Sequence, residues 1–157
     1  MVKKQFTIDY EEYVSVEEMS SADRDLCRAA VEALGGSYAP YSHFHVGAAV
    51  RLSDGTVVKG ANQENAAYPS GLCAERTAMF AAGASHPDED IVSIAVVARQ
   101  DGRICSSPAA PCGACRQVMA QYQTKSGKPM SVILVGAERI WKFACVDDLL
   151  PLIFDNI

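Results

Sequence analysis

The stretch IVSIAVVAR, residues 91–99, is an almost unbroken run of apolar and β-branched side chains. Such a run is typical of a strand covered on both faces, because a strand with one face in solvent alternates apolar and polar residues. A second apolar run, MSVILVG, begins at residue 130. These two segments predict the buried centre of a sheet.

Three helices are predicted around these strands. Ser and Asp capping candidates precede an amphipathic pattern over residues 20–34, and glycines at 35 and 36 end it. Residues 73–84 are helical by propensity, and residues 111–123, PCGACRQVMAQYQ, form a helix that begins at a proline.

The remaining strands are shorter. Residues 44–65, FHVGAAVRLSDGTVVKGANQEN, contain two β-rich runs about a Ser-Asp-Gly turn, the form of an antiparallel hairpin. Gly47 and Gly60 within these runs indicate close packing or a bulge. ERIWKF from residue 138 predicts a fifth strand, and VDDLLPLIF from residue 146 a terminal helical turn.

The alternation of helices with apolar strands predicts an α/β fold. We expect a three-layer α/β/α sandwich in which helices cover both faces of a mixed five-stranded sheet. A chain of 157 residues is one domain by length. We expect a polar extension over residues 1–20 and a single domain over residues 21–157.

Charge and hydropathy disfavour two classes of partner. The formal net charge is −5, and the 14 lysines and arginines are dispersed along the chain, so we expect no nucleic-acid partner. The start, MVKKQFTIDYEEY, lacks the apolar core of a signal peptide, and no apolar run approaches a membrane span. We therefore expect a cytoplasmic protein that does not bind membranes.

Cysteine usage separates into two groups. The chain has six cysteines, which a reducing cytosol would keep as thiols. Cys27, Cys105 and Cys145 stand singly among apolar neighbours, where a cysteine packs as a small hydrophobe.

The other three cysteines begin predicted helices. Cys73 begins one, and Cys112 and Cys115 begin another 39 residues later. Exposed N–H groups and the positive end of the helix dipole favour thiolates there, although a C-x-x-C alone also fits a redox pair. Three protein ligands on zinc leave the fourth position for water, which distinguishes a catalytic site from a structural one. The three histidines lack ligand-like spacing: His43, His45 and His86.

Glu75 follows Cys73 by two residues. A carboxylate there could move protons beside the metal without ligating it. The alternative is an ordinary first-turn glutamate stabilised by the helix dipole.

The combination of C-A-E-R at residue 73 with P-C-x-x-C at residue 111 resembles the zinc-dependent nucleoside deaminases, specifically the small homotetrameric cytidine deaminases of the cytidine and deoxycytidylate deaminase superfamily. The similarity spans about residues 22–154. It includes the segments YAPYSHFHVGAAV, GANQENAAYPSGLCAERTA, PCGACRQV and DDLLP.

The resemblance implies a role for each matching residue at the zinc site. One Zn²⁺ per subunit would be held by Cys73, Cys112 and Cys115. Glu75 would take a proton from the zinc-activated water, protonate ring nitrogen 3 and then pass a proton to the leaving amino group. Arg76 would hydrogen-bond ligand sulfurs and offset their negative charge, the alternative being a solvent-facing helical arginine.

The resemblance also implies substrate contacts. Asn62 and Glu64 match an N-x-E pair that binds the ribose 3′-hydroxyl as acceptors, Phe44 matches the aromatic against the pyrimidine, and the Ala74 N–H matches the donor to the ring carbonyl. Without the resemblance, Asn62 and Glu64 are solvated groups of a hairpin-end loop, and Phe44 is equally a core aromatic.

Neighbouring subunits complete each active site in this family, so a homotetramer is expected. Tyr68 and Phe154 match positions that approach a neighbour's ligand, although Phe154 could instead cover its own core.

The expected function is hydrolytic deamination of cytidine and 2′-deoxycytidine to uridine and 2′-deoxyuridine plus ammonia, in pyrimidine salvage. Three alternatives stay open. They are deamination of a modified or antibiotic cytosine nucleoside, polynucleotide editing, and a catalytically silent structural zinc protein.

Overall fold

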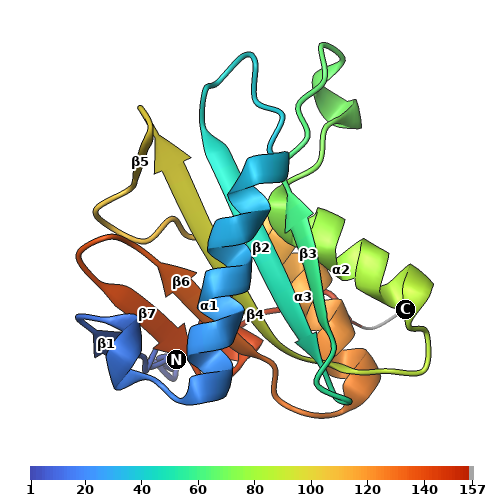
Figure 1. Cartoon of the computed structure of the whole chain (residues 1–157). Helices are drawn as coiled ribbons and strands as arrows, with labels where there is room; N and C mark the ends of the chain where they lie inside the picture. The colour runs from blue at the N-terminus through green and yellow to red at the C-terminus, as the bar shows by residue number, and fades with distance from the viewer. Residues whose placement is uncertain (156–157) are drawn as a thin grey trace.

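A mixed seven-stranded sheet forms the middle layer of the protein in the computed structural model, which describes residues 1–155 (Figure 1). Its strands are β1 (Glu11–Tyr13), β2 (His45–Leu52), β3 (Val57–Ala61), β4 (Ile91–Gln100), β5 (Arg103–Ile104), β6 (Ser131–Val135) and β7 (Ile140–Phe143). The order across the sheet is β1-β7-β6-β4-β2-β3, and β5 pairs with β4. β4 and β6 are parallel, and the other pairs are antiparallel.

Helices cover both faces of this sheet, as expected for a three-layer α/β/α fold. α1 (Ser21–Ala33) lies on one face, and α2 (Ala74–Ser85) and α3 (Gly113–Ser126) lie on the other (Figure 1). The buried residues of β4 divide between the two layers, since Ala95 and Val97 pack in the α1 core while Ile94 and Val96 pack in the α2 and α3 core. Four short 3₁₀ turns complete the secondary structure of the described part of the chain: η1 (Val16–Glu18), η2 (Leu34–Gly36), η3 (Tyr68–Ser70) and η4 (Val146–Asp148).

The sheet has two more strands than the five expected from the sequence. β5 is a two-residue partner of β4, and β1 comes from the stretch expected to be a polar extension. β1 pairs with the free edge of β7, where Trp141 Nε1 donates to Glu12 Oε2 at 2.8 Å. Tyr10 adds ring contacts to Trp141 and Phe143, with centroids 5.8 and 5.4 Å apart. β1 has no apolar alternation because it lies at an exposed edge, so its sequence pattern does not indicate a strand.

Helix boundaries follow from capping. The Ser20 hydroxyl accepts a hydrogen bond from Asp23 N at 3.2 Å and begins α1. Cys73 and Cys112 are the N-cap residues of α2 and α3, so both predicted helices begin directly at these cysteines. α3 ends at Gly127, whose φ of +65° is the left-handed conformation that glycine adopts readily.

Gly47 and Gly60 allow close packing of helices on the hairpin, as their positions predicted. A Cβ on Gly47 would lie 2.3 Å from the carbonyl oxygen of Ala30 in α1. A Cβ on Gly60 would lie 2.3 Å from Ala78 N and 2.7 Å from Ala74 O in α2. The sheet therefore approaches the helix that carries Glu75 with no space for a side chain.

Gly60→Ala is expected to destabilise the fold by about 3 kcal/mol, because the added methyl group meets helix backbone that cannot rotate away. Urea unfolding measures the change. Gly35→Ala is the matched control, since a Cβ there has no neighbour within 4 Å among residues 1–155, and its effect should stay within about 0.5 kcal/mol. Equal effects of the two substitutions would contradict the close approach.

A buried ion-pair cluster connects α1 to the sheet. Asp23 is 5% exposed, accepts a hydrogen bond from Lys142 Nζ at 2.8 Å and pairs with Arg51 Nη2 at 3.2 Å. Burial alone raises the pKa of Asp23, but the hydrogen bonds and charges of Lys142 and Arg51 outweigh it, so the pKa is lowered. The charged carboxylate thus stabilises the folded state.

Asp23→Asn is expected to lower the free energy of unfolding by about 2–3 kcal/mol at pH 7, since it leaves two partly buried cations without a counter-charge. The folded pKa lies below the unfolded value of 3.8, so the stabilisation is complete well above that pH and is lost as the pH falls through 3.8 towards the folded pKa. Denaturation at neutral and acidic pH should show the two proteins converging in acid. Asp25→Asn, at an exposed pair with Arg28, should show neither effect.

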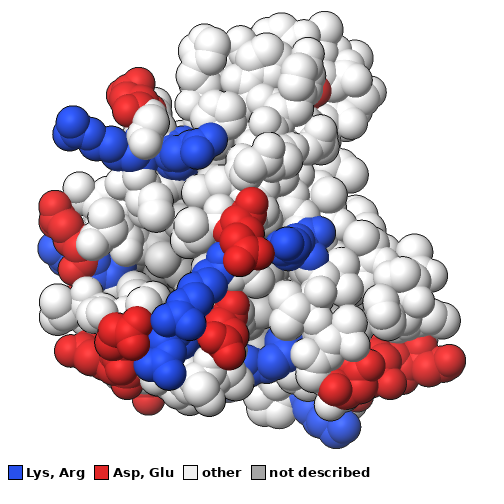
Figure 2. All heavy atoms as spheres, in the orientation of Figure 1, with Lys and Arg blue, Asp and Glu red and all other residues white. Residues whose placement is uncertain are grey.

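The surface shows mixed charge on the face that carries α1. Figure 2 shows Lys and Arg side chains interspersed with Asp and Glu on this face. Among the described helices, none combines the length and apolar character needed to cross a membrane.

Candidate active site

Three cysteine sulfurs meet where α2 and α3 begin. Cys73 Sγ lies 3.9 Å from Cys112 Sγ, and Cys112 Sγ lies 3.5 Å from Cys115 Sγ. Within residues 1–155, this is the only group of at least three His, Cys, Asp or Glu side chains that could hold a metal ion. Its ligand atoms all lie within 4.8 Å of one another. The trio predicted from the sequence is therefore brought together by the fold.

The sulfur spacing fits zinc. Zinc–sulfur bonds of about 2.3 Å in a tetrahedral arrangement place sulfurs about 3.8 Å apart. The observed sulfur–sulfur separations of 3.9 and 3.5 Å lie on either side of that value. With three thiol ligands, the fourth tetrahedral position is left for another ligand.

The electrostatics at the sulfurs favour a thiolate at Cys73. Hydrogen bonds from the Cys115 thiol and from Arg76 lower the pKa of Cys73 to about 5 in spite of its burial. Arg76 Nη2 lies 3.6 Å from Cys73 Sγ. The pKa of Cys115 is raised, because its thiol donates a hydrogen bond to the Cys73 sulfur and because it is buried. Negative charge on the sulfurs thus has a cationic partner in Arg76.

Glu75 lies beside the sulfurs on the first turn of α2 and is only 4% exposed. Burial raises its pKa, and the negative charge of Cys73 acts in the same direction. A carboxyl group that holds a proton more readily than usual is suited to accept and return one near neutral pH. The Arg76 guanidinium has a buried Nε without a hydrogen-bond partner among the described residues.

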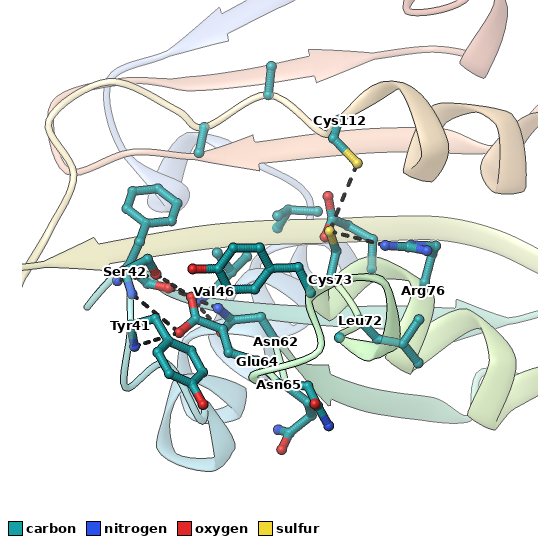
Figure 3. Close-up of a pocket in the computed structure, with 18 residues that line it drawn as sticks. Tyr41, Ser42, Val46, Asn62, Glu64, Asn65, Leu72, Cys73, Arg76 and Cys112 are labelled. Carbon is teal, nitrogen blue, oxygen red and sulfur yellow. Dashed lines mark hydrogen bonds between the residues drawn. The ribbon is translucent and has the colours of Figure 1, made fainter.

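A cleft of about 670 Å³ opens next to the sulfurs. Figure 3 shows Cys73, Cys112 and Arg76 at one end and the loop of Tyr41 and Ser42 at the other. The lining combines apolar side chains with amide, carboxylate and guanidinium groups, a combination typical of small-molecule sites. Its residues are Tyr41, Ser42, Phe44, Val46, Asn62, Gln63, Glu64, Asn65, Tyr68, Gly71, Leu72, Cys73, Glu75, Arg76, Val96, Ala109, Ala110 and Cys112.

The Glu64 carboxylate holds the loop at the far end of the cleft. Glu64 Oε2 accepts from Tyr41 N at 2.8 Å and from Ser42 N at 3.2 Å, and Oε1 accepts from the Ser42 hydroxyl (Figure 3). These hydrogen bonds, that of Ser42 Oγ first, lower the pKa of Glu64. The carboxylate is therefore charged and fixed in orientation at neutral pH.

The comparisons with known proteins agree with this geometry. A sequence profile described as "Cytidine and deoxycytidylate deaminase zinc-binding region" matches residues 20–128. The chain belongs to the cytidine and deoxycytidylate deaminase family. It is a zinc-binding enzyme of that family, and its Cys73, Cys112 and Cys115 sulfurs lie close enough together to hold a metal ion.

Relatives within this family align over most of the chain. A cytidine deaminase of Halalkalibacterium halodurans is 52% identical over 61% of this chain and 68% of its own length. One of Sporosarcina psychrophila is 44% identical over 73% of this chain and 78% of its own length. The crystal structure of cytidine deaminase from Burkholderia pseudomallei superimposes with a TM-score of 0.72 at 41% identity, covering 87% of this chain and all of that one.

Of the other residues predicted from the deaminase resemblance, some line the cleft and one lies outside it. Phe44, Asn62 and Tyr68 line the cleft, and Tyr68 is 79% exposed at its mouth with its ring 6.3 Å from that of Tyr41. Ala74 is fully buried between Cys73 and Glu75. Phe154 lies outside this cleft, 69% exposed, where its carbonyl accepts from Gln117 Nε2 at 2.8 Å.

Several cleft residues were not singled out from the sequence of this deaminase. Tyr41 and Ser42 precede Phe44 in the PYSHF segment, which is part of the deaminase resemblance, so they could have been predicted from that segment. Val96 belongs to the apolar β4 run and Ala109 to a loop, and neither carries a polar signature. Arg116, next to the third cysteine, lies outside the cleft lining and donates to the carbonyl oxygens of Pro111 and Leu149.

Proposed function

We propose that this protein catalyses the hydrolytic deamination of cytidine and 2′-deoxycytidine to uridine and 2′-deoxyuridine, with release of ammonia. The observation that carries this proposal is a buried glutamate beside a three-cysteine metal cluster on the wall of a nucleoside-sized cleft. Relatives at 52% and 44% identity bear the name cytidine deaminase. The same assignment implies a role in pyrimidine salvage in the cytoplasm.

The reaction needs a proton carrier, and Glu75 is the group placed for it. Glu75 accepts a proton from the attacking water and delivers it to ring nitrogen 3. It then takes the proton of the hydroxyl group added at carbon 4 and passes it to the leaving amino group as the carbonyl forms. Its raised pKa suits both directions of transfer, and its burial keeps bulk water from competing. Zinc held by Cys73, Cys112 and Cys115 supplies a Lewis acid that makes water nucleophilic at neutral pH.

The remaining site residues bind and orient the substrate. The phenyl ring of Phe44 packs against the pyrimidine, and the backbone N–H of Ala74 donates to the ring carbonyl oxygen. Asn62 and Glu64 bind the sugar 3′-hydroxyl at the far end of the cleft. Arg76 holds the Cys73 sulfur and offsets part of the thiolate charge, which keeps the metal electrophilic.

The active form in this proposal is a homotetramer whose neighbouring subunits complete each site. Tyr68 stands 79% exposed at the cleft mouth, and Phe154 is 69% exposed away from its own cleft. Large exposed aromatic side chains at these two places suit contacts across subunits. Size-exclusion chromatography with light scattering tests the assembly.

Turnover by the zinc-loaded protein tests the function. The fall in absorbance at about 280 nm should report conversion of cytidine and of 2′-deoxycytidine, with one zinc per chain by elemental analysis. A panel of modified cytosine nucleosides, together with single-stranded DNA at low salt, covers the alternatives. Turnover confined to a modified nucleoside would move the assignment to that substrate, and absence of turnover on every member would reject it.

A further inference from the structure

Two polar side chains outside the metal site are connected to the sugar end of the cleft. Ser37 follows η2, and His45 is the first residue of β2. Ser37 Oγ lies 2.9 Å from His45 Nδ1 and 2.5 Å from Asn62 Oδ1. His45 lacks ligand-like spacing in the sequence, and within residues 1–155 the metal cluster does not include it. The two residues are therefore available for another role.

The orientation of the Asn62 amide is set by backbone groups. Val46 N donates to Asn62 Oδ1 at 2.8 Å, and Asn62 Nδ2 donates to the carbonyl oxygen of Phe44 at 2.8 Å. A backbone N–H can only donate and a carbonyl can only accept, so the oxygen and nitrogen of the amide cannot be exchanged. The atom of Asn62 that Ser37 contacts is thus its oxygen.

The orientation of the amide fixes the position of each proton in the hydrogen bonds between His45, Ser37 and Asn62. Asn62 Oδ1 accepts only, so the single hydroxyl hydrogen of Ser37 is donated to it. Ser37 Oγ then has no hydrogen left for His45, and His45 Nδ1 must carry the proton of the 2.9 Å contact. His45 Nδ1–H therefore donates to Ser37 Oγ, and Ser37 Oγ–H donates to Asn62 Oδ1.

This order determines what Asn62 can offer a substrate. Its oxygen already accepts from Val46 N and Ser37 Oγ, which uses both lone pairs, so only the second Nδ2 hydrogen remains. Glu64 accepts three hydrogen bonds from the 41–42 loop and keeps one acceptor site of about four. One donor beside one acceptor matches a hydroxyl group, which can accept and donate at once.

We infer that Ser37 and His45 are positioning residues for the sugar 3′-hydroxyl, acting through Asn62, and that Asn62 serves as a donor rather than as the acceptor expected from the sequence. This inference rests on the proposed deaminase function. Ser37 takes the second lone pair of the amide oxygen and adds a third hydrogen bond to the two backbone contacts that orient the amide, and His45 orients the Ser37 hydroxyl. Neither side chain touches the reacting base.

A pair of substrates that differ only in the 3′-hydroxyl tests the inference. In Ser37→Ala, the KM for 2′-deoxycytidine is expected to rise about three- to tenfold with kcat within about twofold, because a ground-state contact is loosened while the chemistry is untouched. The KM for 2′,3′-dideoxycytidine is expected to stay at the wild-type value. Equal rises for both substrates, or no rise for either, would overturn the inference.

A matched control is available at the end of α2. Ser85 Oγ also contacts a histidine, with His86 Nδ1 at 2.8 Å, on the exposed surface away from the cleft. Ser85→Ala removes a similar Ser–His contact and should leave both KM values unchanged. Elemental zinc analysis of each variant separates a substrate effect from metal loss.

The tautomer of His45 provides a readout that does not depend on activity. In the ¹⁵N-labelled, zinc-loaded wild-type protein at alkaline pH, long-range ¹H–¹⁵N correlations of the His45 ring should show a protonated Nδ1 and an unprotonated Nε2. The opposite tautomer would overturn the hydrogen-bond order even if every variant folds poorly. Absence of cytidine turnover by the wild-type protein would instead reject the proposed function, while the tautomer still decides the order.

Discussion

Glu75→Gln is expected to lower kcat by about 10²- to 10⁴-fold, the loss typical when a proton-transferring group is removed. Glutamine has nearly the same shape but cannot accept a proton from water or return one to the base. Zinc should stay at one per chain, because the Glu75 carboxylate is not part of the sulfur cluster. Thermal stability should be unchanged or higher, since a neutral amide at a 4% exposed position avoids the cost of burying a charge.

The matched control is a glutamate on the other face of the sheet. Glu32 lies on α1 at an exposed pair with Lys59 Nζ, 3.3 Å away. Glu32→Gln should leave kcat, KM and zinc content at wild-type values. Full activity of Glu75→Gln would remove the proton carrier from the mechanism, and a structural zinc protein would show no functional change in either variant.

Cys115→Ala is expected to lose most of its zinc and at least about 10³-fold of its turnover, because two sulfurs cannot replace a three-sulfur site and the Lewis acid leaves with the metal. Cys115 is fully buried in the first turn of α3, 3.5 Å from Cys112 Sγ. Elemental analysis after dialysis against a weak chelator measures the zinc, and the absorbance assay measures turnover.

Cys27→Ala separates the loss of a ligand from the loss of a buried cysteine. Cys27 is buried in α1, and burial raises the pKa of its thiol to about 12, so it stays protonated. Its removal should cost about 1 kcal/mol of unfolding free energy from the small cavity, with zinc and turnover retained. If Cys115→Ala kept one tightly bound zinc per chain, the three-cysteine site would be contradicted.

Local sequence patterns anticipated most of the fold. The apolar runs became β4 and β6, and the Ser-Asp-Gly hairpin became β2 and β3. Periodicity and capping residues act over a few neighbours along the chain, so they are visible without knowledge of the partner segments. The strand count was wrong for the same reason, since β1 is stabilised by the edge of β7 more than 120 residues away and not by its own pattern.

In the site, too, some features follow from short sequence motifs and others depend on contacts between distant segments. The cysteine trio and Glu75 stand in short motifs whose chemistry is specific, and the fold places them together as predicted. Asn62 was identified from its motif, but the donor role proposed for it depends on Val46 N, Phe44 O and Ser37 Oγ. Those contacts span 16 to 25 residues, and no local spacing encodes them.

By itself, the sequence determined that this protein has three thiols and a neighbouring carboxylate at two helix starts, because helix propensity, a proline at a helix start and metal ligation depend on residue type and local pattern. Only the tertiary structure decided that β1 extends the sheet beyond β7 and that the cleft includes Val96 and Ala109. It also decided that His45 is connected through Ser37 to Asn62. These features depend on hydrogen bonds and burial between segments far apart in the chain, which form only when the layers pack.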